Sequence, residues 1–157
     1  MVKRVYLDTN VYCRPRDDQS DPRVRRESGA FMEIVERAVG GEVEIVSSDY
    51  VKFEVERMND PLKRKDVRGL ERALVKINIK GGLKKVVESS RLLQTECNIN
   101  ALDALHIISA YYGKAEFFLT CDDEILSRRT CIEGFLKRKE YKIKVRNPIE
   151  YVEEMGE

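Results

Sequence analysis

The sequence predicts an α/β fold in three layers, a central parallel sheet with helices on both faces. Its 157 residues match one ordinary domain, so we expect residues 1–157 to form a single unit. A hydrophobic fraction of 42% beside a charged fraction of 36% is typical of globular proteins and excludes disordered and fibrous classes. Strand-like segments alternate with helical ones, which favours parallel strands joined by right-handed crossovers.

Four segments are predicted as strands because they are short, apolar and rich in β-branched or aromatic residues. The first, 2–7, ends at Asp8, and its carboxyl end is therefore marked by an acid. The third ends just before Cys121 and Asp122 and repeats this arrangement. The second, third and fourth predicted strands are 43–47, 116–120 and 142–145.

Helices are predicted between the strands from apolar periodicity and capping residues. The one-sided apolar stripe from Phe31 to Val39 indicates an amphipathic helix that Gly40 and Gly41 stop. Ser48 and Asn100 are typical N-caps for the helices that follow them. These further helices are expected at 49–58, 62–77, 83–96, 101–112, 125–136 and 149–155.

The net charge of +1 hides an uneven distribution of charge along the chain. Residues 62–92 contain ten basic and three acidic side chains. We therefore predict a basic helical insertion at about 61–97. Such a charged segment is either a solvated helix face or a surface that binds phosphates.

The spacing of the cysteines and the length of the apolar runs predict the cellular compartment. The four cysteines are scattered without a C-x-x-C pair, so we expect free thiols in a reducing compartment. No apolar run approaches the ~20 residues of a membrane helix, and the N-terminus lacks a signal-peptide core. The prediction is a cytoplasmic protein without membrane contact. The cysteines are Cys13, Cys97, Cys121 and Cys131.

Four acids are expected to meet at one edge of the sheet. Asp8 and Asp122 follow strands, and Glu54 and Asp103 lie early in helices that begin near the same edge. Ligands of open parallel sheets bind at the carboxyl ends of the strands. Crowded carboxylates repel one another unless a cation neutralises them, and oxygen ligands suit Mg²⁺ or Mn²⁺. The sequence therefore predicts a metal site suited to phosphodiester hydrolysis.

Each acid also has an ordinary structural alternative. Asp8, Asp103 and Asp122 occupy positions where short acids cap turns and helices, and Glu54 could face solvent. Glu56 and Asp123 lie beside two of the acids and are alternative ligands or supporting groups. Only one of Glu54 and Glu56 can face the crevice, because residues two positions apart in a helix point in directions that differ by about 200°.

Four motifs together resemble those of PIN domains, including the VapC-type toxins of toxin–antitoxin pairs. The resemblance runs from about residue 2 to residue 152 and keeps the family order of motifs. The motifs are YLDTN at 6–10, SDYVKFE at 48–54, ALDALH at 101–106 and LTCD at 119–122.

The resemblance implies a sheet of four or five parallel strands, dependence on Mg²⁺ or Mn²⁺, RNA as substrate and frequent homodimers. It also implies a protein inhibitor of the antitoxin kind. By position, the catalytic and metal-binding acids would be Asp8, Glu54, Asp103 and Asp122. Supporting roles would fall to Thr9 or Asn10 beside the first acid, to Thr120 as a hydrogen-bonding group on the metal or phosphate side, and to Asp123.

The expected function is a metal-dependent ribonuclease, with a non-catalytic RNA-binding or assembly module as the alternative. We interpret His106 as a packing residue on an apolar helix, although its place three residues after Asp103 also allows approach to a metal or phosphate. The predicted RNA-binding side chains are Arg14, Arg16, Lys63, Arg64, Lys65 and Arg68.

Overall fold

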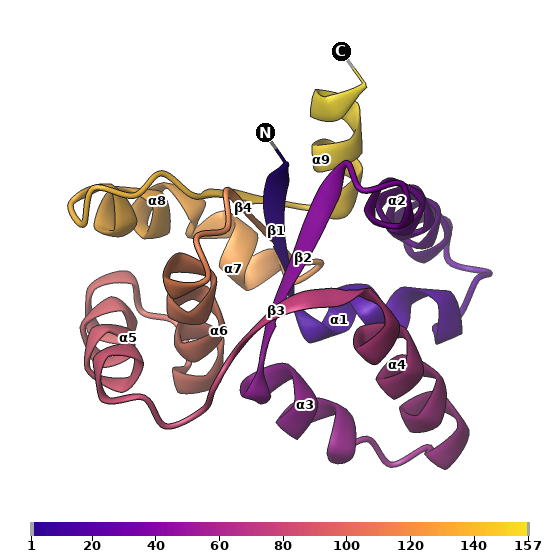
Figure 1. The fold of residues 1–157 in the computed structure, drawn as a ribbon, viewed down its shortest axis with the longest axis horizontal. Coiled ribbons are helices and arrows are strands. Elements are labelled where there is room, and N and C mark those ends of the chain that lie inside the picture. The colour runs from indigo at the N-terminus through magenta and orange to yellow at the C-terminus, as the bar shows by residue number, and fades with distance from the viewer. Residues whose placement is uncertain (1, 157) are drawn as a thin grey trace.

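The computed structural model describes residues 2–156, which contain one parallel five-stranded sheet in the order β3-β2-β1-β4-β5 (Figure 1). Every neighbouring pair of strands runs parallel. The chain moves outward from β1 through β2 to β3, then returns to the other side of β1 for β4 and β5. The switch point thus lies between β1 and β4. The strands are β1 (Lys3–Leu7), β2 (Val43–Ser48), β3 (Val75–Ile79), β4 (Phe117–Leu119) and β5 (Lys144–Arg146).

Helices cover both faces of the sheet (Figure 1). One face is covered by α6 and α8, against which α5 packs, and the other face by α2 and α9. Among the described residues, no helix combines the length and apolarity needed to span a bilayer. The helices are α1 (Thr9–Cys13), the 3₁₀ helix η1 (Arg14–Arg16), α2 (Pro22–Val39), α3 (Asp49–Glu56), α4 (Pro61–Leu74), α5 (Lys84–Cys97), α6 (Ala101–Tyr112), α7 (Asp123–Ser127), α8 (Arg129–Lys137) and α9 (Pro148–Met155).

Capping residues place four helix N-termini close to the sheet edge where the site lies. Asp8 follows β1 directly and caps α1, and Ser48 ends β2 and caps α3. Asp122 caps α7 just beyond β4, and Asn100 caps α6 by accepting a hydrogen bond from the backbone N–H of Asp103. A cap satisfies an N–H group that has no partner inside the helix. The polar side chains of these motifs are therefore fixed where strands turn into helices.

The core lies on both sides of the central strands. Val5, Tyr6 and Leu7 of β1 are inaccessible to solvent, and so are Ile107 and Ile108 of α6. Burial on both faces is typical of a central parallel strand. The predicted fold class is confirmed by this arrangement.

The helix predicted at 62–77 is wrong at its C-terminal end, because residues 75–79 form the edge strand β3. Helix α4 ends at Leu74, and β3 pairs with β2. The helix expected at 125–136 is likewise two helices, α7 and α8, which meet at Arg128.

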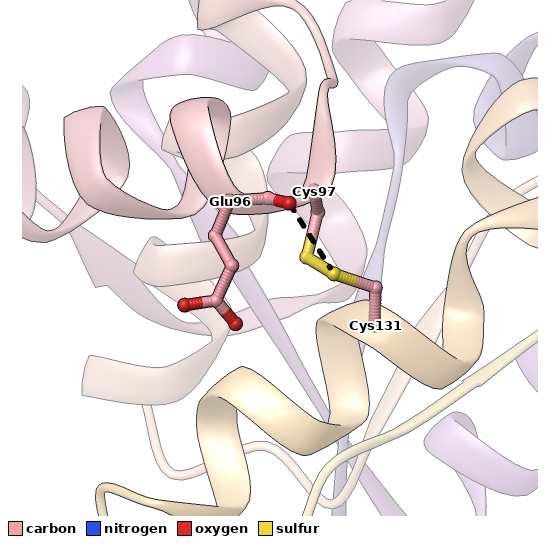
Figure 2. A group of neighbouring side chains, drawn as sticks. All are labelled: Glu96, Cys97 and Cys131. Carbon is pink, nitrogen blue, oxygen red and sulfur yellow. Dashed lines mark hydrogen bonds between the residues drawn. A yellow bond between two sulfur atoms is a disulfide. The ribbon is translucent and has the colours of Figure 1, made fainter.

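The expectation of four free thiols is also wrong, since Cys97 and Cys131 form a disulfide (Figure 2). Their Cα atoms lie 5.7 Å apart although 34 positions separate them along the chain. The bond joins the last residue of α5 to α8, which packs beside it. Cys13 and Cys121 are free and buried. Spacing along the sequence could not reveal the pair, because only the tertiary packing of α5 and α8 brings the sulfurs together.

Candidate active site

The four predicted acids line one open pocket of about 330 Å³ at the carboxyl edge of the sheet, at the switch point of the topology. Asp8 comes from the end of β1, Glu54 from α3, Asp103 from the first turn of α6, and Asp122 from the start of α7. The structure thus brings together side chains from four separate segments. The pocket is also lined by Thr9, Asn10, Cys13, Arg57 and Met58.

Asp8 is buried and held by hydrogen bonds from two motifs. Its Oδ1 accepts from the backbone N–H of Thr9 at 2.8 Å, and its Oδ2 accepts from Oγ1 of Thr120 at 2.8 Å and Nδ2 of Asn10 at 3.3 Å. Oδ1 of Asn10 accepts from the backbone N–H of Cys121 at 3.0 Å. The segment after β1 is therefore joined to the segment after β4. Thr9, Asn10 and Thr120 all lie where they can orient the carboxylate.

Glu54, and not Glu56, faces the pocket. Oε1 of Glu54 accepts a hydrogen bond from Oγ1 of Thr9 at 2.8 Å and is in short contact with Nε2 of His106. Glu56 is exposed and accepts two hydrogen bonds from Arg68, at 2.7 and 2.8 Å. The two glutamates thus face different sides of α3, as the helical geometry requires.

His106 is buried, as expected of a packing residue, but both of its ring nitrogens have polar partners. Nδ1 lies 2.7 Å from the hydroxyl of Tyr6, which lies 2.6 Å from Oγ of Ser48. Nε2 points to the acids and lies 4.0 Å from Oδ1 of Asp8. In the sequence, the position of His106 three residues after Asp103 indicated that it could lie near the acids, because residues with this spacing share a helix face.

The surroundings of the acids shift their pKa values in different directions. Burial, and then the nearby charges of Asp8 and Asp122, raise the pKa of Asp103 to about 7. Burial also raises the pKa of Asp8. For Glu54 burial acts in the same sense, but the hydrogen bonds from His106 and Thr9 outweigh it and lower the pKa. A site in which two acids resist ionisation is one where a cation is strongly favoured.

Asp122 and its neighbour Asp123 differ in position. Asp122 caps α7 through a 2.8 Å hydrogen bond from the backbone N–H of Glu124 and still lines the pocket. Asp123 is exposed and forms two 2.8 Å hydrogen bonds with Arg23, which also donates to the carbonyl of Cys121. The structure therefore places Asp123 away from the pocket, where it helps to anchor the loop after β4 to α2.

Most of the basic residues predicted to contact RNA already have protein partners. Arg14 donates to Glu27 at 2.8 Å and to Asp17 at 2.7 Å, and Lys63 donates to Asp17 at 2.8 Å. Lys65 is exposed and has no side-chain partner within residues 2–156. The remaining pairs are Arg16 with Asp66, Arg68 with Glu56, and Arg64 with the carbonyl oxygen of Met58.

Arg57 is a basic side chain of the pocket that the sequence motifs did not indicate. It is exposed at the end of α3 and lines the pocket with the acids. Its guanidinium also lies 5.2 Å from the ring centre of Phe53. The signal in the sequence was its position three residues after Glu54, on the same side of the helix.

The donor set fits a hard divalent cation. Ligand atoms of Asp8, Glu54 and His106 lie within 4.8 Å of one another, and Asp103 and Asp122 line the same pocket. Carboxylate oxygens are the ligands that Mg²⁺ and Mn²⁺ favour. The second acid–cysteine group, formed by Glu96, Cys97 and Cys131, does not fit, because its sulfurs are bonded to each other (Figure 2).

No family model matches the sequence. No curated protein sequence matches it either. The fold, in contrast, matches solved structures. VapBC2 from Rickettsia felis, bound to a DNA fragment from its promoter, gives a TM-score of 0.55 at 15% identity, over 90% of this chain and 98% of that chain.

Two further structures agree with this result. FitAcB from Neisseria gonorrhoeae gives a TM-score of 0.54 at 16% identity, over 92% of this chain and 97% of that chain. FitAB bound to an IR36 DNA fragment gives a TM-score of 0.54 at 14% identity, over 92% of this chain and 95% of that chain. Likeness at such low identity shows the fold, and the predicted PIN-like α/β fold is confirmed.

Proposed function

We propose that this chain is a divalent-metal-dependent endoribonuclease that hydrolyses phosphodiester bonds in RNA. One observation carries the proposal: Asp8, Glu54, Asp103 and Asp122, from four separate segments, line one pocket at the carboxyl edge of the sheet. Helix capping accounts for the positions of Asp8 and Asp122, but it does not account for the presence of Glu54 and Asp103 in the same pocket. Burial, and then the charges of Asp8 and Asp122, raise the pKa of Asp103 to about 7, and a bound cation would offset this unfavourable ionisation.

The proposed roles follow from the positions of the side chains. Asp8, Glu54, Asp103 and Asp122 hold Mg²⁺ or Mn²⁺. The ion supplies the positive charge that activates water and stabilises the phosphate oxygens. Thr120 and Asn10 orient Asp8 through their hydrogen bonds.

Arg57 and Lys65 are the proposed phosphate contacts. Arg57 shares the pocket with the acids, where a guanidinium can pair with two oxygens of one phosphate. Lys65 is exposed on α4 and adds affinity that does not depend on sequence. The predicted contacts Arg14, Arg16 and Lys63 would have to exchange their present carboxylate partners for phosphate.

We also propose that the chain forms a homodimer and acts as the toxin of a toxin–antitoxin pair, with a protein inhibitor as its partner. The structures of matching fold, VapBC2 and FitAB, are complexes bound to DNA fragments. Together with the VapC-like motifs, this likeness supports an antitoxin-like partner for the present chain.

The test is an RNA cleavage assay on the purified chain with Mn²⁺, with Mg²⁺ and with EDTA. We expect cleavage only with the ions. Asp8→Asn, Glu54→Gln and Asp103→Asn should each reduce the rate by at least about 100-fold. Glu56→Gln is the matched control for Glu54→Gln on the same helix and should cleave like the parent, since Glu56 faces Arg68 outside the pocket.

The competing result is equally clear. If RNA is retarded on a gel but never cut, and the aspartate variants bind RNA as the parent does, the chain is a non-catalytic RNA-binding module. Equal loss of cleavage in Glu54→Gln and Glu56→Gln would also contradict the assignment of the site.

A further inference from the structure

The ring of His106 has the position of a metal ligand. It lies on α6 one turn after Asp103, and its Nε2 contacts Oε1 of Glu54 and lies 4.0 Å from Oδ1 of Asp8. Two ligands of one ion, each at about 2.1 Å, lie at most about 4.2 Å apart. The Asp8–His106 separation is within this limit, whereas the short contact with Glu54 must lengthen for an ion to enter.

A chain of hydrogen bonds behind the ring fixes its orientation. Nδ1 of His106 can donate to the Tyr6 hydroxyl, which in turn donates to Oγ of Ser48. Oγ of Ser48 also accepts from the backbone N–H of Tyr50, so it is held in place by the start of α3. In this tautomer, which replaces the hydrogen bond from Nε2 to Glu54, the lone pair of Nε2 points to the acids. Metal-binding histidines almost always have their second nitrogen fixed in this way.

We propose that Nε2 of His106 is a direct ligand of the divalent ion, together with Asp8 and Glu54. The proposal rests on the metal-dependent function argued above and adds a nitrogen to its oxygen ligands. An imidazole ligand suits transition metals, while Mg²⁺ strongly favours oxygen. The site should therefore favour Mn²⁺ over Mg²⁺ more than a purely carboxylate site would.

A competing arrangement is that His106 only positions Glu54. In that case Nε2 keeps its proton, donates a hydrogen bond to the carboxylate of Glu54, and never contacts the ion. Loss of the ring would then weaken metal binding as well, so affinity alone does not separate the two arrangements. A direct measurement of a nitrogen–metal bond does.

The decisive experiment is pulsed electron paramagnetic resonance of the full chain loaded with Mn²⁺. His106 is the single histidine of the sequence, so labelling with ¹⁵N-histidine marks this ring alone. We expect a ¹⁴N coupling in unlabelled protein that is replaced by a ¹⁵N coupling after labelling. A bound Mn²⁺ signal without histidine coupling would overturn the proposal. This measurement uses the unaltered protein and needs no variant to fold.

Calorimetric titration of variants gives a second readout. His106→Gln should raise the Kd for Mn²⁺ at least about tenfold and the Kd for Mg²⁺ by less, so the preference for Mn²⁺ falls. Tyr6→Phe keeps the ring but removes the hydroxyl behind Nδ1, and should raise the Kd for Mn²⁺ by about 10-fold. Glu56→Gln, outside the pocket, should leave both constants unchanged. An unaltered preference in His106→Gln would contradict the proposal.

The outcomes separate this inference from the function on which it rests. Mn²⁺-dependent cleavage without histidine coupling removes the inference and leaves the ribonuclease proposal intact. Histidine coupling in a protein that never cuts RNA supports the ligand and contradicts the ribonuclease. Absence of any Mn²⁺ binding overturns both.

Discussion

Asp103 is the acid whose ionisation is disfavoured most clearly by its position in this site. Its backbone N–H is capped by Asn100, but within the described residues its carboxylate accepts no hydrogen bond. Burial and the charges of Asp8 and Asp122 raise its pKa from the ordinary 3.8 to about 7. An acid in such surroundings is more easily protonated in the folded than in the unfolded chain.

The contribution of Asp103 to the stability of the metal-free protein should therefore fall with rising pH. Below about pH 4 Asp103 is protonated in both states. Between about pH 4 and 7 the folded chain holds a proton that the unfolded chain has released, so the free energy of unfolding decreases. Asp103→Asn removes this decrease in the free energy of unfolding, because asparagine does not ionise. In EDTA at pH 8 its Tm should exceed that of the parent by about 2–4 °C, which corresponds to roughly 1 kcal/mol.

Thermal melts from pH 4 to pH 8 measure this difference. At pH 4 the variant and the parent should melt together, since both side chains are then neutral. With saturating Mn²⁺ at pH 8 the order should reverse, because the parent gains more from the ion. A Tm difference that is constant across the pH range would contradict the raised pKa.

The convergence of the four acids could be predicted from the sequence, but the partners of those acids could not. Asp8 and Asp122 each follow a segment with clear strand character, and parallel strands deliver their carboxyl ends to one edge. His106 and Arg57 gave a weaker signal, because spacing on a helix shows which residues share a face and not what that face meets. The contact between His106 and Glu54 depends on how α3 and α6 pack.

At the scale of elements, β3 shows where sequence patterns fail. Residues 75–79 alternate apolar and polar side chains, as an edge strand does, but they follow a helix without an intervening glycine or proline. The C-terminal end of α4 is marked only by the extended backbone of Val75, whose N–H donates to the carbonyl of Glu71. The other four strands end at polar residues or turns, and their positions could therefore be predicted.

The end of α6 provides a test of packing against the sheet. A Cβ added at Gly113 would overlap Cγ1 of Val46 in β2. Gly113→Ala should therefore cost about 1–3 kcal/mol and lower the Tm by about 2–10 °C. Gly134 in α8 is the matched control, since a Cβ there would meet no atom within 4 Å.

Gly134→Ala should stabilise the protein by about 0.5–1 kcal/mol, because alanine restricts the unfolded chain and favours the helix. Chemical denaturation of both variants measures the two changes. Equal effects at the two positions would show that α6 is not as close to β2 as described.

At the scale of the whole molecule, the disulfide holds together two regions that flank the last two acid motifs. Cys97 precedes Asp103 by six positions, and Cys131 follows Asp122 by nine. The covalent loop therefore contains α6, β4 and α7. Neither the pairing of these cysteines nor the order of the strands could be predicted from residue patterns, because both depend on long-range packing.

Reduction of this bond should destabilise the chain. Closure of a loop of 34 residues is worth about 3–4 kcal/mol in the chain-entropy model, so dithiothreitol should lower the Tm by about 6–15 °C. The double variant Cys97→Ser with Cys131→Ser should melt at the lower temperature with or without the reductant. A parent protein whose Tm is insensitive to dithiothreitol would show that the bond contributes nothing to stability.

The same cross-link determines what a protease would leave behind. If one peptide bond between positions 97 and 131 is hydrolysed, the amino-terminal fragment keeps one sulfur and the carboxyl-terminal fragment keeps the other. On a non-reducing gel the nicked chain would migrate as a single band, and it would separate into two bands only after reduction. A cut outside this interval would release a free fragment at once.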